Sequence, residues 1–385
     1  MNLYAFELGR KKELCFAELL AVFGEKSLRE RNLDTAIFSL SKFDPRHLQN
    51  SLGGTIKIIE IVDEFSSLHE NEIHSSIQTL LEKHLKGRSG KIPFSVTALG
   101  FKNPREINIK DLLNFSKKIL KSFSLNSRFV NKDFRSPAPS TIYKAKVVEK
   151  GVDINIIKGN SGIFLGRAIS IQNIDAYSLR DYEKPRRAAS VGMLPPKLAQ
   201  IMINLVGPTD TIYDPFCGTG TVLTEAMLMG KTAIGSDLDV KMVEFTETNC
   251  LWLRHEFRAT GRYRVFQRDA RFITKNQLPE AIDAIITEGY LGKLHTALPS
   301  EPEREKIFRE LALLHLNWLR AVHSATPKTC RTVMCLTAFR VQNRLEHFPR
   351  FQELANEAGW KITETFTYDR PDQIVARDIV ILDKK

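Results

Sequence analysis

The chain has 385 residues, of which 43% are hydrophobic and 26% are charged. This balance is typical of folded globular proteins and excludes a mainly disordered chain, and the length predicts two or three domains. No window holds the roughly 18 consecutive apolar residues of a membrane helix. The N-terminus lacks the apolar core and cleavage site of a signal peptide, so we expect a cytoplasmic protein without a membrane partner.

The charge is more informative than the rest of the composition. Lys and Arg outnumber Asp and Glu by 56 to 45, a formal net charge of +11. Such a surplus favours a polyanionic partner, most often nucleic acid. The five cysteines are scattered and form no CxxC pair. We therefore expect reduced thiols and no metal site.

In the first 170 residues the apolar spacing predicts an α+β arrangement. Helices are expected over residues 13–23, 73–84 and 109–123, and strands over 3–7, 93–99, 142–148, 153–157 and 163–169. Residues 136–140, Ser-Pro-Ala-Pro-Ser, indicate a turn-rich connection. This half contains a basic set that favours phosphate contact: Lys83, Lys86, Arg88, Lys91, Lys102, Lys110, Lys117, Lys118 and Lys121.

From about residue 173 the pattern changes to alternating strand and helix. Pro195-Pro196 opens a helix that Gly207-Pro208 closes. A strand over 211–213, a glycine-rich turn, a helix over 222–229 and a strand over 232–237 follow. This βαβ unit predicts a parallel α/β architecture.

The glycine-rich turn carries the first candidate site. Residues 214–221 read Asp-Pro-Phe-Cys-Gly-Thr-Gly-Thr, between a strand and a helix N-terminus, where glycines let the backbone approach a ligand. The next strand ends at Asp237, where a carboxylate can hold the ribose hydroxyls of an adenosine cofactor. A pyrophosphate would favour a longer glycine run without Asp214. An acidic residue beside the glycines suits the ammonium and sulfonium of S-adenosylmethionine.

These two segments resemble motifs I and II of class I methyltransferases, in the branch that modifies exocyclic nitrogens. The resemblance places Asp269-Ala270, after an expected strand over 264–266, at the adenine, and it leaves Cys217 packed under the loop. It implies a cofactor site formed by Asp214, Pro215, Phe216, Gly218, Gly220, Thr221, Asp237, Leu238, Asp269 and Ala270.

Residues 283–292 have the pattern of a buried strand that runs into a glycine turn. Amino-methyltransferases carry Asp/Asn-Pro-Pro-Tyr/Phe at this place, where the acidic or amide group accepts a hydrogen bond from the target amine and the aromatic ring stacks on the flipped base. Here Glu288 replaces the acidic residue, Gly289 and Tyr290 replace the prolines, and Leu291 stands in the aromatic position. We interpret this as a variant catalytic loop in which glycine loosens the turn. The nearby His295 is expected at the surface.

Residues 177–187 and 192–199 are similar to the segment that enters the catalytic domain of THUMP-containing tRNA guanine-N2 methyltransferases. Residues 4–19 resemble the N-terminal ferredoxin-like domain of that family, residues 65–170 its THUMP domain, and residues 368–380 its closing hairpin. The resemblance implies three domains, 1–64, 65–170 and 171–385. The last would be a class I Rossmann-like methyltransferase domain with a mostly parallel seven-stranded sheet.

The resemblance further implies an S-adenosylmethionine-dependent enzyme that methylates N2 of a guanosine in tRNA, often at position 10, with THUMP gripping the acceptor end. The expected RNA contacts are Lys110, Lys117, Arg180, Lys184, Arg186 and Arg187. Two other functions stay open: a DNA amino-methyltransferase, and an RNA-binding protein whose altered loop has lost catalysis. The sequence also leaves open whether an activating subunit or a second copy of the chain takes part.

Overall fold

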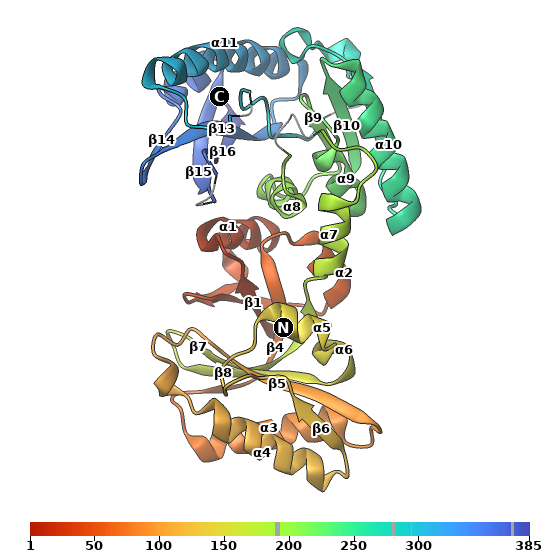
Figure 1. Ribbon diagram of the computed structural model, residues 1–385, viewed down its shortest axis with the longest axis vertical. Coiled ribbons are helices and arrows are strands. Elements are labelled where there is room, and N and C mark those ends of the chain that lie inside the picture. The colour runs from red at the N-terminus through yellow and green to blue at the C-terminus, as the bar shows by residue number, and fades with distance from the viewer. Residues whose placement is uncertain (189–192, 279–281, 294, 371–372) are drawn as a thin grey trace. The chain divides into compact units, whose positions relative to one another are not determined.

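The computed structural model describes residues 1–188, 193–278, 282–293, 295–370 and 373–385 (Figure 1). These residues form two compact units, 1–176 and 177–385, each built around one sheet. Gly192, the first residue of the second stretch of the expected entry segment (192–199), lies outside the described residues. None of the helices formed by the described residues combines the length and hydropathy of a membrane span.

The first unit is built on a mixed sheet with the order β2-β3-β1-β4-β8-β7-β5-β6. All neighbours in it are antiparallel except β5, which runs parallel to both β6 and β7. The strands are β1 (Asn2–Leu8), β2 (Leu28–Arg31), β3 (Thr35–Leu40), β4 (Thr55–Phe65), β5 (Lys91–Leu99), β6 (Asn126–Phe129), β7 (Val152–Lys158) and β8 (Ile163–Ile171). The long strand β4 joins the segments that the sequence assigned to two domains, because it pairs with β1 on one side and β8 on the other.

Helices α3 and α4 pack on this sheet through their apolar side chains. Ile77 and Leu113 are fully buried in one core with Phe94 and Ile154 of the strands. The helices of the unit are α1 (Lys12–Phe23), α2 (Pro45–Ser51), α3 (Glu70–Leu85), α4 (Ile109–Ser122), α5 (Pro139–Lys144) and α6 (Val147–Lys150), with 3-10 turns η1 (Glu25–Ser27) and η2 (Pro104–Glu106).

The strand expected over residues 142–148 is wrong. These residues form α5 and α6, because Pro139 starts a helix at its first turn and Lys146 adopts a left-handed backbone that separates the two helices. Ile142 and Val147, whose branched side chains suggested a strand, are both buried. They reach the core from short helices instead.

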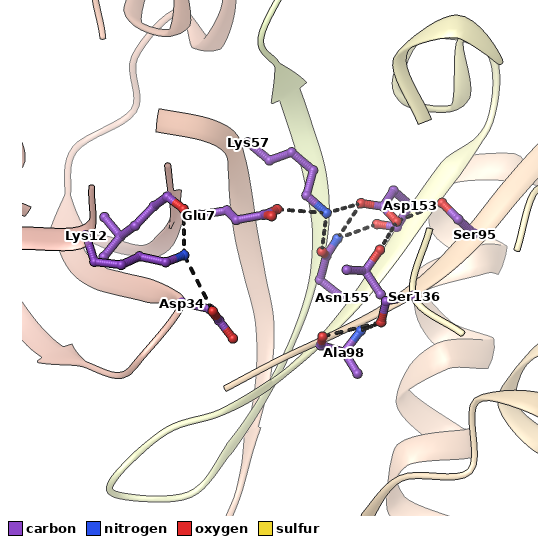
Figure 2. A network of polar contacts seen from close by, with 11 residues as sticks. Glu7, Lys12, Asp34, Lys57, Ser95, Ala98, Ser136, Asp153 and Asn155 are labelled. Atoms are coloured by element: carbon purple, nitrogen blue, oxygen red, sulfur yellow. Dashed lines mark hydrogen bonds and ion pairs between the residues drawn. The ribbon is translucent and has the colours of Figure 1, made fainter. Parts of the chain in front are cut away.

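A buried polar network crosses the sheet of the first unit (Figure 2). The ammonium of Lys57, on β4, lies 2.8 Å from Asp153 Oδ2, 3.0 Å from Asn155 Oδ1 and 3.2 Å from Glu7 Oε2. Asp153 also accepts hydrogen bonds from the hydroxyls of Ser95 and Thr97. Burial lowers the pKa of Lys57, but the carboxylates of Asp153 and Glu7 outweigh burial and raise it above its ordinary value. The lysine is therefore charged in the interior.

The second unit has the expected mostly parallel sheet. Seven strands follow the order β11-β10-β9-β12-β13-β16-β15, and β14 pairs with β13 beside this path. The first five run parallel, and β16 is antiparallel to both of its neighbours. The strands are β9 (Thr211–Asp214), β10 (Thr232–Asp237), β11 (Tyr263–Gln267), β12 (Ala284–Thr287), β13 (Arg331–Val341), β14 (Arg344–Glu346), β15 (Trp360–Tyr368) and β16 (Val375–Lys384).

Helices cover both faces of this sheet (Figure 1). Trp318 of α11 and Phe351 of α12 pack with Tyr213, Ile285 and Met334 of the strands on one face, whereas α8, α9 and α10 pack on the other. The helices are α7 (Ile174–Tyr182), within which the two units divide, α8 (Pro196–Leu205), α9 (Thr221–Leu228), α10 (Val240–Phe257), α11 (Glu301–Ala325) and α12 (Phe351–Glu357), with 3-10 turns η3 (Ala270–Phe272) and η4 (Lys275–Gln277).

The strand order fixes where a ligand can bind. The chain builds β9, β10 and β11 outward on one side, and then continues with β12 and β13 on the other side of β9. Loops leaving the carboxyl ends of β9 and β12 therefore diverge, and they leave a crevice at this switch point.

Candidate active site

A cavity of about 540 Å³ lies at the carboxyl ends of β9, β10, β11 and β12. Gly220 and Leu291 are the two expected residues that do not line it. The expected residues that do line it are Asp214, Pro215, Phe216, Gly218, Thr221, Asp237, Leu238, Asp269, Ala270, Glu288, Gly289 and Tyr290. Side chains that come from four separate loops thus share one cavity.

The loop between β9 and α9 is held close to the sheet by its glycines. Gly218 and Gly220 have φ values of +52° and +82°, which a glycine adopts without strain. A Cβ on Gly220 would lie 2.8 Å from the Thr246 side chain, so the close approach also requires glycine. The Gly218 N–H donates a 2.9 Å hydrogen bond to Asp237 Oδ2, which ties this loop to the end of β10.

Asp214 is a buried carboxylate at the end of β9, with a relative exposure of 2%. Its hydrogen-bond donors are neutral: the Phe216 N–H at 3.0 Å and the hydroxyl of Thr287. Burial raises the pKa of Asp214 to about 7, against the lowering effect of these donors. A cationic ligand in the cavity would favour the ionised form of Asp214, for which no ion pair is formed within the described part of the chain.

Asp237 and Asp269 follow the next two strands. Asp237 accepts from the Gly218 and Asp239 N–H groups, and burial raises its pKa. Asp269 is paired with Arg271 through contacts of 2.6 to 3.1 Å, and the hydrogen bond from Arg271 lowers its pKa. An adenine amine at Asp269 would therefore have to share that carboxylate with Arg271.

These features fit S-adenosylmethionine. The buried Asp214 suits the ammonium of its amino-acid end, the carboxylate of Asp237 suits ribose hydroxyls, and Gly218 has open space where a Cβ would be. Cys217 is buried in the same loop, and burial raises the pKa of its thiol well above the ordinary value. It is a packed thiol, as expected.

Glu288 follows β12 and is held by a residue of β16. Arg377 Nε donates a 2.6 Å hydrogen bond to Glu288 Oε1, and the two side chains are 10% and 15% exposed. Burial raises the pKa of Glu288, whereas Arg377 lowers it. This buried pair supplies a carboxylate beside the cofactor cavity.

The turn after Glu288 differs from the expected loosened proline turn. Gly289 has φ +68°, whereas proline is fixed near −65°, and its N–H donates a 2.9 Å hydrogen bond to Thr287 Oγ1 that a proline could not make. The glycine is therefore required by a turn of different shape. The Thr287 hydroxyl links this turn to Asp214.

A second cavity, of about 440 Å³, shares Met193, Glu288, Gly289 and Tyr290 with the first. Its other lining residues are Leu291, Gly292, Lys293, His295, Thr296, Gln373, Ile374, Val375 and Arg377. Tyr290 is 44% exposed where the two cavities meet. His295, which we expected at the surface, lies half-buried, with its ring in a T-shaped contact with the ring of Phe339.

Two residues expected to contact RNA are buried instead. Arg180 makes hydrogen bonds of 2.7 and 3.1 Å to the two carboxylate oxygens of Glu225, which is fully buried on α9. The Lys184 ammonium donates to the hydroxyls of Thr219 and Thr221, and burial lowers its pKa to about 8. Both cations support the glycine loop, so we no longer expect them to contact RNA.

The other expected RNA contacts are exposed. Arg186 lies over the ring of Phe245 and Arg187 over that of Tyr182, while Lys110 and Lys117 lie on α4. Near α4, His74 hydrogen-bonds Asp111 at 2.8 Å and, with Glu70, forms a group that could hold a metal ion. The His74 ring also stacks on Phe115, so packing and this hydrogen bond account for its position.

Sequence reasoning missed a basic pocket of about 520 Å³ in the first unit. Lys91 was expected in the basic set, but Arg128, Lys132 and Lys150, which also line the pocket, were not. All four are exposed, and none forms an ion pair with a carboxylate of the described chain. Because they come from β5, the β6 region and α6, their proximity is set by the sheet.

Comparison with known proteins agrees with this geometry. Residues 183–297 match UPF0020, an RMKL-like methyltransferase domain family. Over 121 residues, 31% of this chain and 33% of the relative, it is 41% identical to a tRNA (guanine(10)-N2)-dimethyltransferase of Methanothermobacter thermautotrophicus. Over 167 residues, 42% and 46% of the two chains, it is 29% identical to the enzyme of that name from Methanocaldococcus jannaschii. The chain thus spans a third to a half of the length of these curated relatives.

A solved structure shows the fold over the whole chain. TrmN from Thermus thermophilus superposes with a TM-score of 0.54 at 14% sequence identity, covering 100% of both chains. The α/β fold with a Rossmann-like methyltransferase unit is therefore confirmed. Together, the domain match over residues 183–297 and these sequence relatives confirm the resemblance to the tRNA guanine-N2 methyltransferase family.

Proposed function

We propose that this protein is a cytoplasmic S-adenosylmethionine-dependent enzyme that methylates N2 of a guanosine in tRNA, in the region of position 10. The observation that carries the proposal is the pair of adjoining cavities that meet at Glu288, Gly289 and Tyr290. One has the carboxylates and glycines of a cofactor site, and the other has room and polar groups for a base. The relatives named above act on this position by their names.

The cofactor site assigns a role to each carboxylate. When bound, S-adenosylmethionine supplies a methyl group carried on a sulfonium. Asp214 holds its charged amino-acid end, Asp237 holds the ribose hydroxyls, and Asp269-Ala270 lie against the adenine. Lys184, donating to Thr219 and Thr221, keeps the glycine loop in the shape that admits the cofactor. Catalysis would then rest mainly on positioning.

The catalytic loop orients the target amine. Glu288 accepts a hydrogen bond from the exocyclic amine at one carboxylate oxygen, and it takes the proton that the amine gives up. Tyr290, half-exposed between the cavities, stacks on the unstacked base. Leu291 supports the loop through its carbonyl, which accepts a 2.8 Å hydrogen bond from the Thr337 hydroxyl.

The first unit supplies the RNA-binding surface of this proposal. We assign residues 1–64 and 65–170 to ferredoxin-like and THUMP modules of one sheet, and residues 171–385 to the catalytic domain. The exposed lysines of α4 and the pocket of Lys91, Arg128, Lys132 and Lys150 support binding to RNA phosphates. Arg186 and Arg187 are the contacts that we retain from the segment entering the second unit.

One observation favours a second candidate. The Gly289 turn departs in shape from the proline turn of amino-methyltransferases, which is what a protein that binds tRNA without catalysis could show. The experiment below decides between the two functions.

The test uses the full chain with labelled S-adenosylmethionine and unmodified total tRNA, followed by nucleoside mass spectrometry. We expect labelled N2-methylguanosine from the wild type and a loss of activity of at least about 100-fold in Glu288→Gln. The amide has one hydrogen-bond acceptor fewer than the carboxylate, and it cannot take up the proton of the amine. Glu353→Gln, at an exposed ion pair with Arg350, is the matched control and should retain activity.

Each outcome is informative. Label on another nucleoside of tRNA, or faster methylation of duplex DNA, would overturn the assigned base or substrate. Tight binding of tRNA and cofactor with no label would favour either a missing activating subunit or the non-catalytic alternative, and adding a cell extract that restores labelling would distinguish the two.

A further inference from the structure

The second cavity contains a donor and an acceptor that are already paired. Arg377 and Glu288 both line it, and both are nearly buried. Arg377 uses its Nε to hold Glu288 Oε1 at 2.6 Å. Because Arg377 is on β16 and Glu288 follows β12, strand packing fixes both groups before any substrate enters.

The pair has hydrogen-bonding capacity that no described residue uses, and both of its residues line the second cavity. Within the described part of the chain, neither Nη group of Arg377 has a hydrogen-bond partner, and Glu288 Oε2 accepts no hydrogen bond. A guanidinium is always charged and has five N–H donors, of which one is used here. A carboxylate accepts about four hydrogen bonds, so Oε1 can accept a second one.

The order of these groups matches one base edge. By covalent connectivity through the Nε–Oε1 hydrogen bond, the pair runs from the Arg377 Nη donors to Glu288 Oε1 and then to Glu288 Oε2. The Watson–Crick edge of guanine presents, in the same order, the O6 acceptor, the N1–H donor and the N2 amine donor. The geometry points to Glu288 and Arg377 as one recognition element for guanine, in which Arg377 donates to O6 while Glu288 accepts from N1–H and N2–H.

Other bases satisfy fewer of these groups. Adenine and cytosine each present an amine donor beside a ring-nitrogen acceptor, so they can occupy one carboxylate oxygen and one guanidinium donor. The third position is then left without a partner in a nearly buried site, which strongly disfavours the wrong base. This inference rests on the proposed function and deepens it, because it makes Arg377 the residue that selects guanine.

The test is a double-mutant cycle that combines substitution of Arg377 with substitution of O6 on the target guanine. Once nucleoside analysis has located the methylated guanosine, a tRNA is assembled with 6-thioguanosine at that position, which keeps N1–H and N2 but replaces O6 with a poor acceptor. In the wild type we expect the thio substitution to lower kcat/KM by about 10-fold, and Arg377→Met to lower it by about 30-fold or more on guanosine. In Arg377→Met the thio substitution should then cost less than about twofold, because the donor is gone.

Controls separate recognition from folding. Arg377→Lys keeps a cation beside Glu288 and should fold. A lysine ammonium lacks the planar, forked donors with which the guanidinium contacts Glu288 and O6 together, so we expect kcat/KM to fall by about 10-fold. Arg331→Met removes another arginine that bridges β13 and β16, by its pair with Asp383, and should leave the thio effect unchanged. S-adenosylhomocysteine binding should be the same in all variants.

The two hypotheses fail differently. No methylated guanosine from the wild type would remove the proposed function and this inference with it. Methylated guanosine with an undiminished thio effect in both Arg377 variants would retain the proposed function and overturn the role of Arg377.

Discussion

Asp214 illustrates how a single residue can couple cofactor binding to pH. Its carboxylate is buried, and burial raises its pKa to about 7 although the neutral donors of Phe216 and Thr287 lower it. Because the pKa is higher in the folded chain than in the unfolded chain, the stability it contributes is full below about pH 4 and is lost as the pH rises through about 7. A ligand with a positive charge reverses this preference, since it binds the ionised form.

We therefore expect S-adenosylhomocysteine, which keeps the ammonium, to bind more tightly as the pH rises from about 5.5 to 7.5, with release of a proton in this window. Calorimetry in two buffers of different ionisation enthalpy would measure both quantities. Asp214→Asn should bind more weakly and lose the pH dependence, whereas Asp44→Asn, at an exposed helix cap, should behave as the wild type. An unchanged proton release in Asp214→Asn would assign the titration to another group.

A second prediction for a single residue concerns Gly289. Its φ of +68° disfavours any side chain, although the nearest atom that an added Cβ would meet, Cys335 O, is 3.8 Å away. Gly289→Ala should cost about 1–2 kcal/mol of stability from backbone strain alone. Gly207→Ala is the control, because Gly207 has φ +82° and open space around an added Cβ, and it lines neither cavity, so it should lose stability without losing activity.

Gly289→Pro separates the two shapes of the turn. Proline would restore the residue that the amino-methyltransferase motif carries, but it conflicts with the φ and removes the N–H bonded to Thr287. We expect methyl transfer to fall by at least about 100-fold, with a lower thermal transition. Full activity in this variant would mean that the turn adopts the proline-type shape during catalysis.

At the scale of helices and strands, the sequence predicted site residues that lie close together in the chain, but it did not predict contacts between residues far apart in the chain. Asp214, the glycines and Asp237 are readable because one strand–turn–helix–strand stretch of the sequence contains them all. Arg377 lies 89 residues after Glu288, and nothing in its own segment indicates this partner. Lys184 reads as an exposed charge in a polar segment, and only tertiary packing places it against Thr219 and Thr221.

The first unit shows the same limit of local signals. Strand β4 pairs with partners more than 100 residues apart in sequence, so its sheet joins the two segments that the resemblance assigned to separate domains. Residues 142–148 have strand-like composition, but Pro139 and the left-handed Lys146 impose two short helices. The strand propensity of these residues was outweighed there by the backbone conformations of Pro139 and Lys146.

The network around Lys57 yields a prediction for these elements. Lys57→Met leaves Asp153, which is fully buried, without its cation, and should cost about 3–5 kcal/mol in the first unit. Hydrogen exchange of peptides from residues 1–176, measured in the full chain, would report this loss. Lys12→Met is the control, because the Lys12–Asp34 pair of Figure 2 is about a third exposed at 32% for each side chain, and should cost less than about 1 kcal/mol.

A double variant tests the cause. Lys57→Met with Asp153→Asn removes both charges and should recover part of the stability, since the uncompensated carboxylate is gone. If the double variant is instead less stable than Lys57→Met by as much as Asp153→Asn alone destabilises the wild type, side-chain packing contributes more to this network than charge pairing does.

For the whole molecule, the sequence predicted a net positive charge, but it did not predict that four basic side chains gather in one pocket. The surplus of +11 is spread over 385 residues, but the sheet of the first unit brings together Lys91, Arg128, Lys132 and Lys150. Cations that lack carboxylate partners attract phosphates most effectively, because binding releases the counterions of the RNA. The dependence of tRNA binding on salt is therefore the measurement that counts such contacts.

Replacing Arg128 and Lys132 together by alanine should weaken tRNA binding and make its logarithmic dependence on salt shallower by roughly 1.4, about 0.7 for each lost contact with single-stranded phosphate. Lys328→Ala, an exposed lysine at the turn before β13, should leave the slope unchanged. Binding is measured with catalytically silent Glu288→Gln protein between about 50 and 200 mM salt, so that turnover does not alter the RNA. A weaker affinity with an unchanged slope would show that these side chains contact bases or sugars. Equal slopes and equal affinities would place the phosphate-binding surface elsewhere, with the exposed lysines of α4 as the next set to replace.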